Sequence, residues 1–239
     1  MKYMGSKSKI AKEIVPILQK YIQENNIKNY VEPFVGGANI IDKIVCRNKI
    51  GNDNQKYLIE LFNNLEKINY LPDTITKEHY SDVRNSYNCK DKRYEDWYIG
   101  AVGFLSSYNG RFFDGGYSGV VKTKNGGLRN YYMESLENLK NQSPNLKNIT
   151  FIFGDYKDIN VPKNSLVYCD PPYIGTKQYN TSRNFNYEEY WEWVREISKY
   201  SIVICSELQA PKDFKCIWEK EVNRTIDNNK TVKQNDKLF

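Results

Sequence analysis

Ser165-Leu166-Val167-Tyr168-Cys169-Asp170-Pro171-Pro172-Tyr173 joins an apolar run to an acidic turn that contains two prolines. The run predicts a buried strand ending at Cys169, and open α/β sheets bind ligands at the carboxyl ends of their strands. The prolines remove two N–H donors and leave carbonyls that only accept hydrogen bonds. A carboxylate, rigid carbonyls and an aromatic ring together fit a planar group that carries an amine, such as a nucleobase. The alternative is a strand-ending turn with Tyr173 packed beneath it.

A second strand end lies near the start of the chain. Tyr30-Val31-Glu32 predicts a strand that leads into Pro33-Phe34-Val35-Gly36-Gly37. Glycine permits positive φ and lets a ligand approach the backbone closely. Residues 40–46 then predict a helix, and 49–53 a strand ending in Asp53, where an acid can accept both hydroxyls of a ribose. Each feature alone also fits a tight turn or a helix N-cap, but together they favour a cofactor site.

The type of cofactor follows from what this turn lacks. It does not have the full GxGxxG spacing of a dinucleotide site, and Asp170-Pro171-Pro172-Tyr173 has no role in hydride transfer. A ribose-bearing cofactor without a pyrophosphate fits better, and S-adenosylmethionine is one.

Other segments predict an α/β chain with one insertion. Residues 6–24, 55–67 and 187–199 have helical spacing, with Pro16 expected to interrupt the first. Strands are expected at 149–153, 165–169, 202–206 and 216–221, and from Lys237 onward. Residues 70–147 have a different texture, with glycines, basic residues and aromatics interleaved. We therefore expect one domain from 1–69 and 148–239, and an inserted lobe at 70–147.

Composition narrows the class of protein. The 239 residues carry a net charge of +6 with a pI near 8.8, which suits a polyanionic partner without proving one. Aromatic residues make up 14% of the chain and include 20 tyrosines. There is no apolar signal segment and no membrane-spanning run, so we expect a soluble, cytoplasmic protein.

Cysteine and histidine exclude several chemistries. The five cysteines are odd in number and form no CxxC pair, which predicts reduced thiols and no zinc site or disulfide framework. None follows a proline, so the Pro-Cys nucleophile of a C5-cytosine methyltransferase is missing. His79 is the single histidine, which makes triad chemistry improbable.

Five short motifs occur in one order: Tyr3-Met4-Gly5-Ser6-Lys7, Val31 to Gly37, Asn52-Asp53, Gly154-Asp155-Tyr156 and Asp170 to Tyr173. With these motifs in this order, the chain resembles the Dam-like (D12 class) DNA N6-adenine methyltransferases, particularly the short phage and prophage members. The resemblance covers nearly the whole chain. The resemblance implies an α/β fold: a Rossmann-like S-adenosylmethionine-dependent methyltransferase sheet with an inserted, mainly helical target-recognition lobe. It also implies site-specific methyl transfer to N6 of an adenine flipped from double-stranded DNA, with no metal.

The resemblance assigns roles by position. Tyr3 and Lys7 would border the methionine end of the cofactor, Asp53 its ribose, and Asp155 and Tyr156 its adenine. The full expected cofactor set is Tyr3, Lys7, Glu32, Phe34, Gly36, Asp53, Asp155, Tyr156 and Asp170. The expected catalytic set is Asp170, Pro171, Pro172 and Tyr173, with Tyr173 stacking on the target base. One departure is Ala38, where many relatives have a second glycine, and we expect it to alter affinity at most.

Two glycine-rich basic stretches in the insertion are candidates for DNA contact, 108–111 and 122–129. The candidate residues are Tyr108, Asn109, Arg111, Lys122, Lys124 and Arg129. Arginine can read guanine and asparagine can read adenine in the major groove. The alternative is a solvated loop that touches only phosphates.

Other activities share a Pro-Pro-Tyr turn. They include N6-adenine methylation of RNA and methylation of cytosine N4 or protein glutamine, and a non-catalytic DNA-binding relative is a further alternative. Aspartate at position 170 and a lobe between the two halves of the site favour DNA adenine. The recognition sequence and any partner restriction endonuclease stay open.

Overall fold

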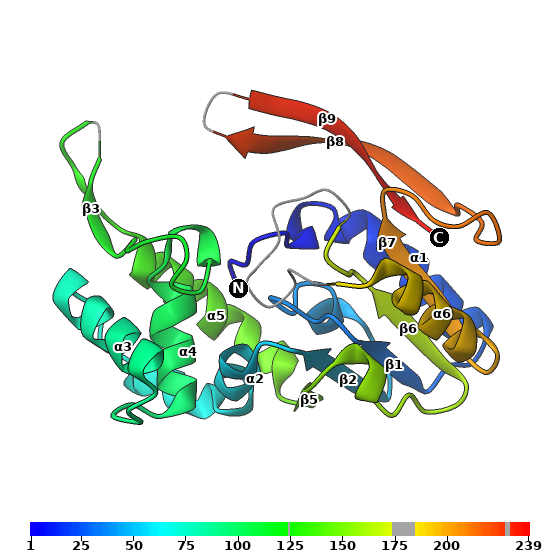
Figure 1. Cartoon of the computed structure of the whole chain (residues 1–239), viewed down its shortest axis with the longest axis horizontal. Coiled ribbons are helices and arrows are strands. Elements are labelled where there is room, and N and C mark those ends of the chain that lie inside the picture. The colour runs from blue at the N-terminus through cyan, green and yellow to red at the C-terminus, as the bar shows by residue number, and fades with distance from the viewer. Residues whose placement is uncertain (124, 174–184, 228–229) are drawn as a thin grey trace.

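The computed structural model describes residues 1–123, 125–173, 185–227 and 230–239, and within them seven strands form one sheet (Figure 1). The strand order is β5-β2-β1-β6-β7-β9-β8. The strands are β1 (Asn29–Glu32), β2 (Asn48–Asp53), β5 (Ile149–Phe153), β6 (Ser165–Cys169), β7 (Ile202–Glu207), β8 (Trp218–Asp227) and β9 (Lys230–Leu238). The first five in spatial order are parallel, and β9 runs antiparallel to β7 and β8.

The strand order reverses between β1 and β6. From β1 the sheet continues outward to β2 and β5, whereas from β6 it continues to β7. The register pairs Val31 with Val167, so the two strands end side by side, at Glu32 and Cys169. The turns that begin at Pro33 and Asp170 therefore open at the same edge, which is where sheets of this kind bind ligands.

Helices cover both faces of the sheet. Because successive strand residues point to opposite faces, Tyr30 and Leu166 pack in one core cluster and Val31 and Val167 in another. The first cluster includes the buried face of α1 (Ala11–Glu24) and α2 (Lys56–Asn63), and the second that of α6 (Tyr187–Ser198). These layers hold the strand ends in place.

The chain between α2 and β5 forms a helical group beside the sheet (Figure 1). It contains α3 (Lys77–Cys89), α4 (Asp96–Leu105), α5 (Tyr131–Leu146) and a hairpin of β3 (Val120–Lys122) and β4 (Leu128–Asn130). Short 3₁₀ helices are η1 (Lys7–Lys9), η2 (Ile41–Lys43), η3 (Leu65–Tyr70), η4 (Tyr108–Gly110) and η5 (Tyr156–Asp158). The boundaries 70 and 147 of the inserted lobe stay a prediction.

Three expected elements differ from the structure. The predicted helix at 40–46 is only the η2 turn, since Ile40, Ile41 and Ile44 reach the core without a longer helix. Pro16 does not interrupt α1, because the carbonyl it leaves unpaired belongs to exposed Lys12 and the buried face of the helix continues past it. The helix predicted at 55–67 ends at Asn63 and is followed by η3.

The last two strands are longer than predicted. β8 and β9 pair as a hairpin whose polar sequence lacks the alternation that predicts strands. Cross-strand ion pairs accompany the pairing, with Lys233 Nζ 2.7 Å from Glu221 Oε1 and Lys237 Nζ 3.6 Å from Glu219 Oε1. Among the described residues, no helix is both long enough and apolar enough to cross a membrane.

Candidate active site

The turn after β1 is tied to β2 by backbone and carboxylate contacts. Val35 N donates to the Asn52 carbonyl at 2.8 Å, and Gly36 N donates to Asp53 Oδ2 at 3.0 Å. Gly36 has a φ of +47°, and a methyl group there would lie 3.0 Å from the Tyr3 ring. The turn therefore needs glycine both for its backbone conformation and for the approach of Tyr3.

Ala38 adopts the left-handed conformation, with φ at +54°. This conformation costs an L-residue other than glycine roughly 1–2 kcal/mol. The backbone thus explains why the family resemblance implies a glycine here, and alanine holds the same shape under strain. Ala38 is fully buried, so its surroundings keep the turn in this conformation.

Asp53 lies at the end of β2 with 9% of its surface exposed. Burial raises the pKa of Asp53 to about 6, although the N–H groups of Gly36 and Gln55 favour its charged form. Each carboxylate oxygen accepts one of these two bonds and can accept another. The site therefore keeps acceptor capacity for ligand hydroxyl groups, which fits a ribose.

Asn52, the residue before Asp53, links three strand ends. Its Nδ2 donates to the carbonyl of Pro33 at 3.1 Å and to that of Gly154 at 3.0 Å. Its Oδ1 is buried and has no donor among the residues that the structure describes. Asn52 is thus a second unfilled acceptor beside the predicted cofactor site.

The N-terminal motif and the Asp170 turn meet directly. Lys7 Nζ lies 3.1 Å from Asp170 Oδ1, donates to the Tyr173 hydroxyl, and stands 4.2 Å from the centre of the Tyr173 ring. The Tyr173 hydroxyl also shares a hydrogen bond with Ser206 Oγ at 2.8 Å. The structure therefore brings together two predicted motifs that lie more than 160 residues apart in the sequence.

The surroundings of Lys7 keep it protonated. Burial lowers the pKa of Lys7, but Asp170, Tyr173 and Asp236 outweigh it, so that the pKa stays above its ordinary value. Burial raises the pKa of Tyr173 to about 12. Lys7 is thus a buried ammonium beside an acid whose side chain is 21% exposed.

The carbonyl oxygen of Pro172 already accepts a hydrogen bond. The Tyr187 hydroxyl, at the start of α6, donates to the Pro172 carbonyl at 2.7 Å. This contact fixes the orientation of the turn and occupies one lone pair of that oxygen.

Aromatic rings fill the space behind the first turn. The Phe34 ring centre lies 5.2 Å from that of Tyr156 and 5.8 Å from that of Phe185. Tyr156 is buried in this group, whereas Asp155 is exposed and accepts from Lys157 N at 3.0 Å. Roles for Tyr156 and Asp155 toward an adenine stay predictions.

Glu32 lies beneath the turn rather than at its surface. It is 3% exposed, and Tyr30 donates to its Oε1 at 2.7 Å. Burial raises the pKa of Glu32 well above its ordinary value. Its cofactor role also stays a prediction.

The predicted DNA-contacting residues lie in two groups. Tyr108 and Asn109 are exposed in η4, whereas Arg111 is drawn toward Asp114, 3.4 Å away. Lys122 is exposed on β3, and Arg129 makes a bidentate contact of 2.6 and 2.9 Å with Glu134. Lys124 lies outside the described residues.

Four residues of this region escaped sequence reasoning: Ser206, Asp236, Tyr187 and Gln142. Ser206 is the last residue of a predicted strand, and Asp170 directly follows another. Its position at a strand end could therefore have marked Ser206 as a candidate site residue. The others have no local pattern, because their partners lie outside their own segments of the sequence.

Among the described residues, no cluster of three or more His, Cys, Asp or Glu side chains could hold a metal ion.

The strand order, with the two turns opening at one edge of a mostly parallel sheet, defines a Rossmann-like α/β fold. The model of the D12 class N6 adenine-specific DNA methyltransferases matches residues 3–209. The chain is 30% identical to the Type II methyltransferase M.MjaIII of Methanocaldococcus jannaschii, over 80% of this chain and 73% of that protein. It therefore belongs to the D12 class N6 adenine-specific DNA methyltransferase family.

Two other relatives are much longer than this chain. The Type II methyltransferase M.FokI of Planomicrobium okeanokoites is 24% identical over 85% of this chain but 33% of its own length. The modification methylase StsI of Streptococcus sanguinis is 26% identical over 77% of this chain and 30% of its own. Among solved structures, an rRNA methyltransferase, aviRa from Streptomyces viridochromogenes, aligns with a TM-score of 0.46 and 10% identity, over 99% of this chain and 85% of that one.

Proposed function

We propose that this DNA adenine methyltransferase binds S-adenosylmethionine between the Gly36 turn and Asp170, and methylates N6 of an adenine flipped from duplex DNA. The observation that carries the proposal is that both turns open at the same edge of the sheet. There Lys7 Nζ, from the N-terminal motif, lies 3.1 Å from Asp170 Oδ1. When bound, the cofactor supplies a methyl group activated by a sulfonium. Asp53 would accept hydrogen bonds from its ribose hydroxyls.

Asp170 and a proline carbonyl would orient the target amine. The lone pair of an adenine amine is delocalised into the ring, so the amine is a poor nucleophile until two acceptors draw it toward sp³ geometry. Asp170 is one acceptor. We assign the second to the Pro171 carbonyl, because one of the two lone pairs of the Pro172 carbonyl already accepts from Tyr187. The amine so oriented would accept the methyl group that the bound cofactor supplies, and it would then lose a proton to solvent.

Positioning accounts for most of the rate in this mechanism. Aligned reactants can supply roughly 7–11 kcal/mol of a barrier. Lys7 holds the Asp170 carboxylate in one place, where it can accept hydrogen bonds. Asp170 need not be a strong base, because the amine becomes acidic once it is methylated.

A flipped base leaves its stack at a cost of a few kcal/mol. Tyr173 would offset part of that cost by stacking. Tyr173 is only 5% exposed, and Lys7 and Ser206 hold its hydroxyl, so its stacking on a base stays a prediction. Around the site, Lys122 and Arg129 on the hairpin would bind phosphates or bases, and exposed Tyr108 and Asn109 would approach the groove.

The test is methyl transfer from labelled S-adenosylmethionine to DNA of mixed sequence, followed by nucleoside mass spectrometry of the digest. We expect N6-methyladenine. Exclusive N4-methylcytosine, or transfer to RNA alone, would refute the proposal. Sequencing of methylated sites then gives the recognition sequence.

A further inference from the structure

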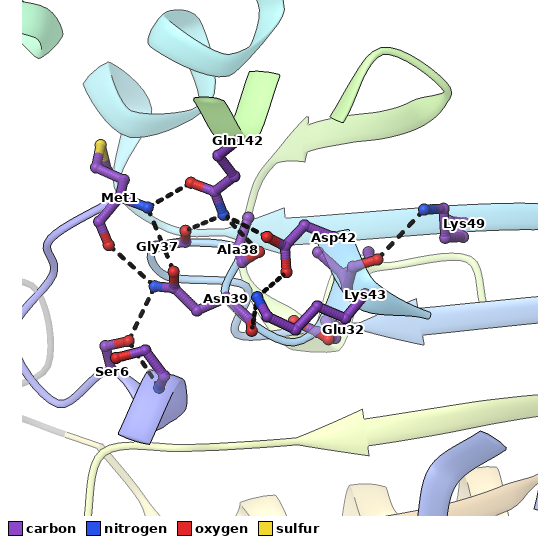
Figure 2. A network of polar contacts seen from close by, with 12 residues as sticks. Met1, Ser6, Glu32, Gly37, Ala38, Asn39, Asp42, Lys43, Lys49 and Gln142 are labelled. Atoms are coloured by element: carbon purple, nitrogen blue, oxygen red, sulfur yellow. Dashed lines mark hydrogen bonds and ion pairs between the residues drawn. The ribbon is translucent and has the colours of Figure 1, made fainter. Parts of the chain in front are cut away.

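Gln142 lies on α5, in the 70–147 segment, yet it contacts the turn that follows β1 (Figure 2). It is 7% exposed. Its Nε2 donates to the Ala38 carbonyl at 2.9 Å, with the Gly37 carbonyl at 3.2 Å and Asp42 Oδ2 at 3.1 Å. Its Oε1 accepts from the Met1 amino group, as Figure 2 shows. A single amide therefore contacts several parts of the turn region.

These contacts fall where the turn needs support. Ala38 is held at a φ of +54°, which is unfavourable for alanine. Gly36, two residues earlier, donates its N–H to Asp53, the proposed ribose acceptor. A turn that relaxed at Ala38 would move Gly36 and change the placement of Asp53.

The same helix begins at the hairpin. Asn130 is the last residue of β4 and caps α5, accepting from Met133 N at 3.0 Å. α5 is therefore one continuous helix that runs from the base of the exposed hairpin to the cofactor turn.

We infer that Gln142 is a positioning residue, through which α5 holds the glycine turn in its cofactor-binding shape. The inference rests on the proposed binding of S-adenosylmethionine at this turn. It assigns to a residue of the insertion a part in cofactor affinity, in addition to any part that the insertion has in DNA recognition. Gln142 acts through the backbone of Gly37 and Ala38 and does not contact the reacting atoms.

The experiment measures the dissociation constant of S-adenosylmethionine by calorimetry for wild type, Gln142→Leu and Asn141→Leu. Asn141 is the exposed neighbour on α5 and serves as the matched control. We expect Gln142→Leu to weaken binding about tenfold, because a buried donor is lost and its acceptors are left unpaired. Asn141→Leu should bind like wild type.

A second substitution separates positioning from simple destabilisation. Ala38→Gly removes the strain that Gln142 opposes, so adding it to Gln142→Leu should recover about threefold in affinity. If Gln142→Leu folds poorly, Gln142→Met keeps the side-chain volume and gives the same comparison.

The outcomes are distinguishable. A wild type that does not bind the cofactor would refute the proposed function. A wild type that binds, together with a Gln142→Leu protein whose folded fraction binds equally tightly, would refute the inference alone. Loss of affinity that Ala38→Gly does not recover would also refute it.

Discussion

Lys7 Nζ lies 3.1 Å from Asp170 Oδ1, so that a 3₁₀ turn near the start of the chain pairs with the turn that follows β6. Lys7 is buried and Asp170 partly so, so water screens the attraction between the two charges less than in an exposed pair. The contact fixes where the acid points. It also brings the N-terminal motif next to the turn that carries the proposed catalytic acid.

Removing the ammonium should misplace Asp170. We expect Lys7→Met to lower the single-turnover rate by about 100-fold, the effect of moving a catalytic group by roughly 1 Å. Lys9→Met, an exposed neighbour on η1, should behave like wild type. A Lys7→Met rate within about twofold of wild type would contradict this role for Lys7.

Protonation of Asp53 should link stability to pH. Its pKa is about 6 in the folded protein and near the ordinary value of 3.8 when unfolded, so the native state binds more protons between these values. Stability from this group is greatest below pH 3.8 and is lost as pH rises through 6. The stability of wild type relative to Asp53→Asn should therefore fall by up to about 1.4 kcal/mol per pH unit across that window. Urea unfolding at several pH values measures it, and a flat difference would contradict the prediction.

The same group should make cofactor binding depend on pH. Ionised Asp53 accepts ribose hydroxyls better than the acid does, so affinity should weaken as pH falls below about 6. Asp53→Asn should bind weakly at every pH, with no such dependence. Calorimetric titrations from pH 5 to 8 on wild type and variant would decide between ionised Asp53 and another titrating group.

At Gly110 the backbone of the insertion lies close to that of the N-terminal segment. Its φ is +65°, and a methyl group there would lie 2.4 Å from the Lys2 carbonyl oxygen. Gly116 also has positive φ, at +74°, but a methyl group would meet nothing within 4 Å. We expect Gly116→Ala to cost roughly 1–2 kcal/mol of stability. Gly110→Ala should cost about 1–3 kcal/mol more, because the clash is with backbone. Equal losses in chemical unfolding would mean that the two segments do not depend on this close approach.

The Arg129–Glu134 pair restrains a proposed DNA contact. Glu134→Gln should free Arg129 and strengthen DNA binding roughly twofold to fivefold at low salt, the scale of an exposed ion pair. Glu24→Gln makes the same charge change at an exposed position, the last residue of α1, and should have a smaller effect. Fluorescence anisotropy over a salt series measures both, and equal effects would mean that only net charge matters.

Lys122→Ala should lower the salt slope by about 1 if Lys122 binds a phosphate.

Strand ends were predictable from sequence because their signal is local. β5 and β6 begin and end at the predicted residues, where apolar runs meet glycine or aspartate. The strand ends then place the Gly36 and Asp170 turns together through the parallel order of the sheet. The absent helix at 40–46 shows the limit of this reasoning, since buried isoleucines can be accommodated by a single turn.

Contacts between distant segments could not be predicted in this way. Gln142 looks like a surface residue of a helix, yet it is buried against Ala38 and Gly37. The positive φ of Ala38 was likewise hidden, although its place in a glycine motif was a clue. Such features depend on how elements pack and not on the residues beside them.

Asp170→Ala tests the central claim most directly, with calorimetry of S-adenosylmethionine and labelled transfer to DNA measured on the same protein. The account predicts that the variant remains folded, still binds DNA and binds the cofactor more weakly than wild type, while no N6-methyladenine forms even at saturating cofactor. Methyl transfer at the wild-type rate would contradict it.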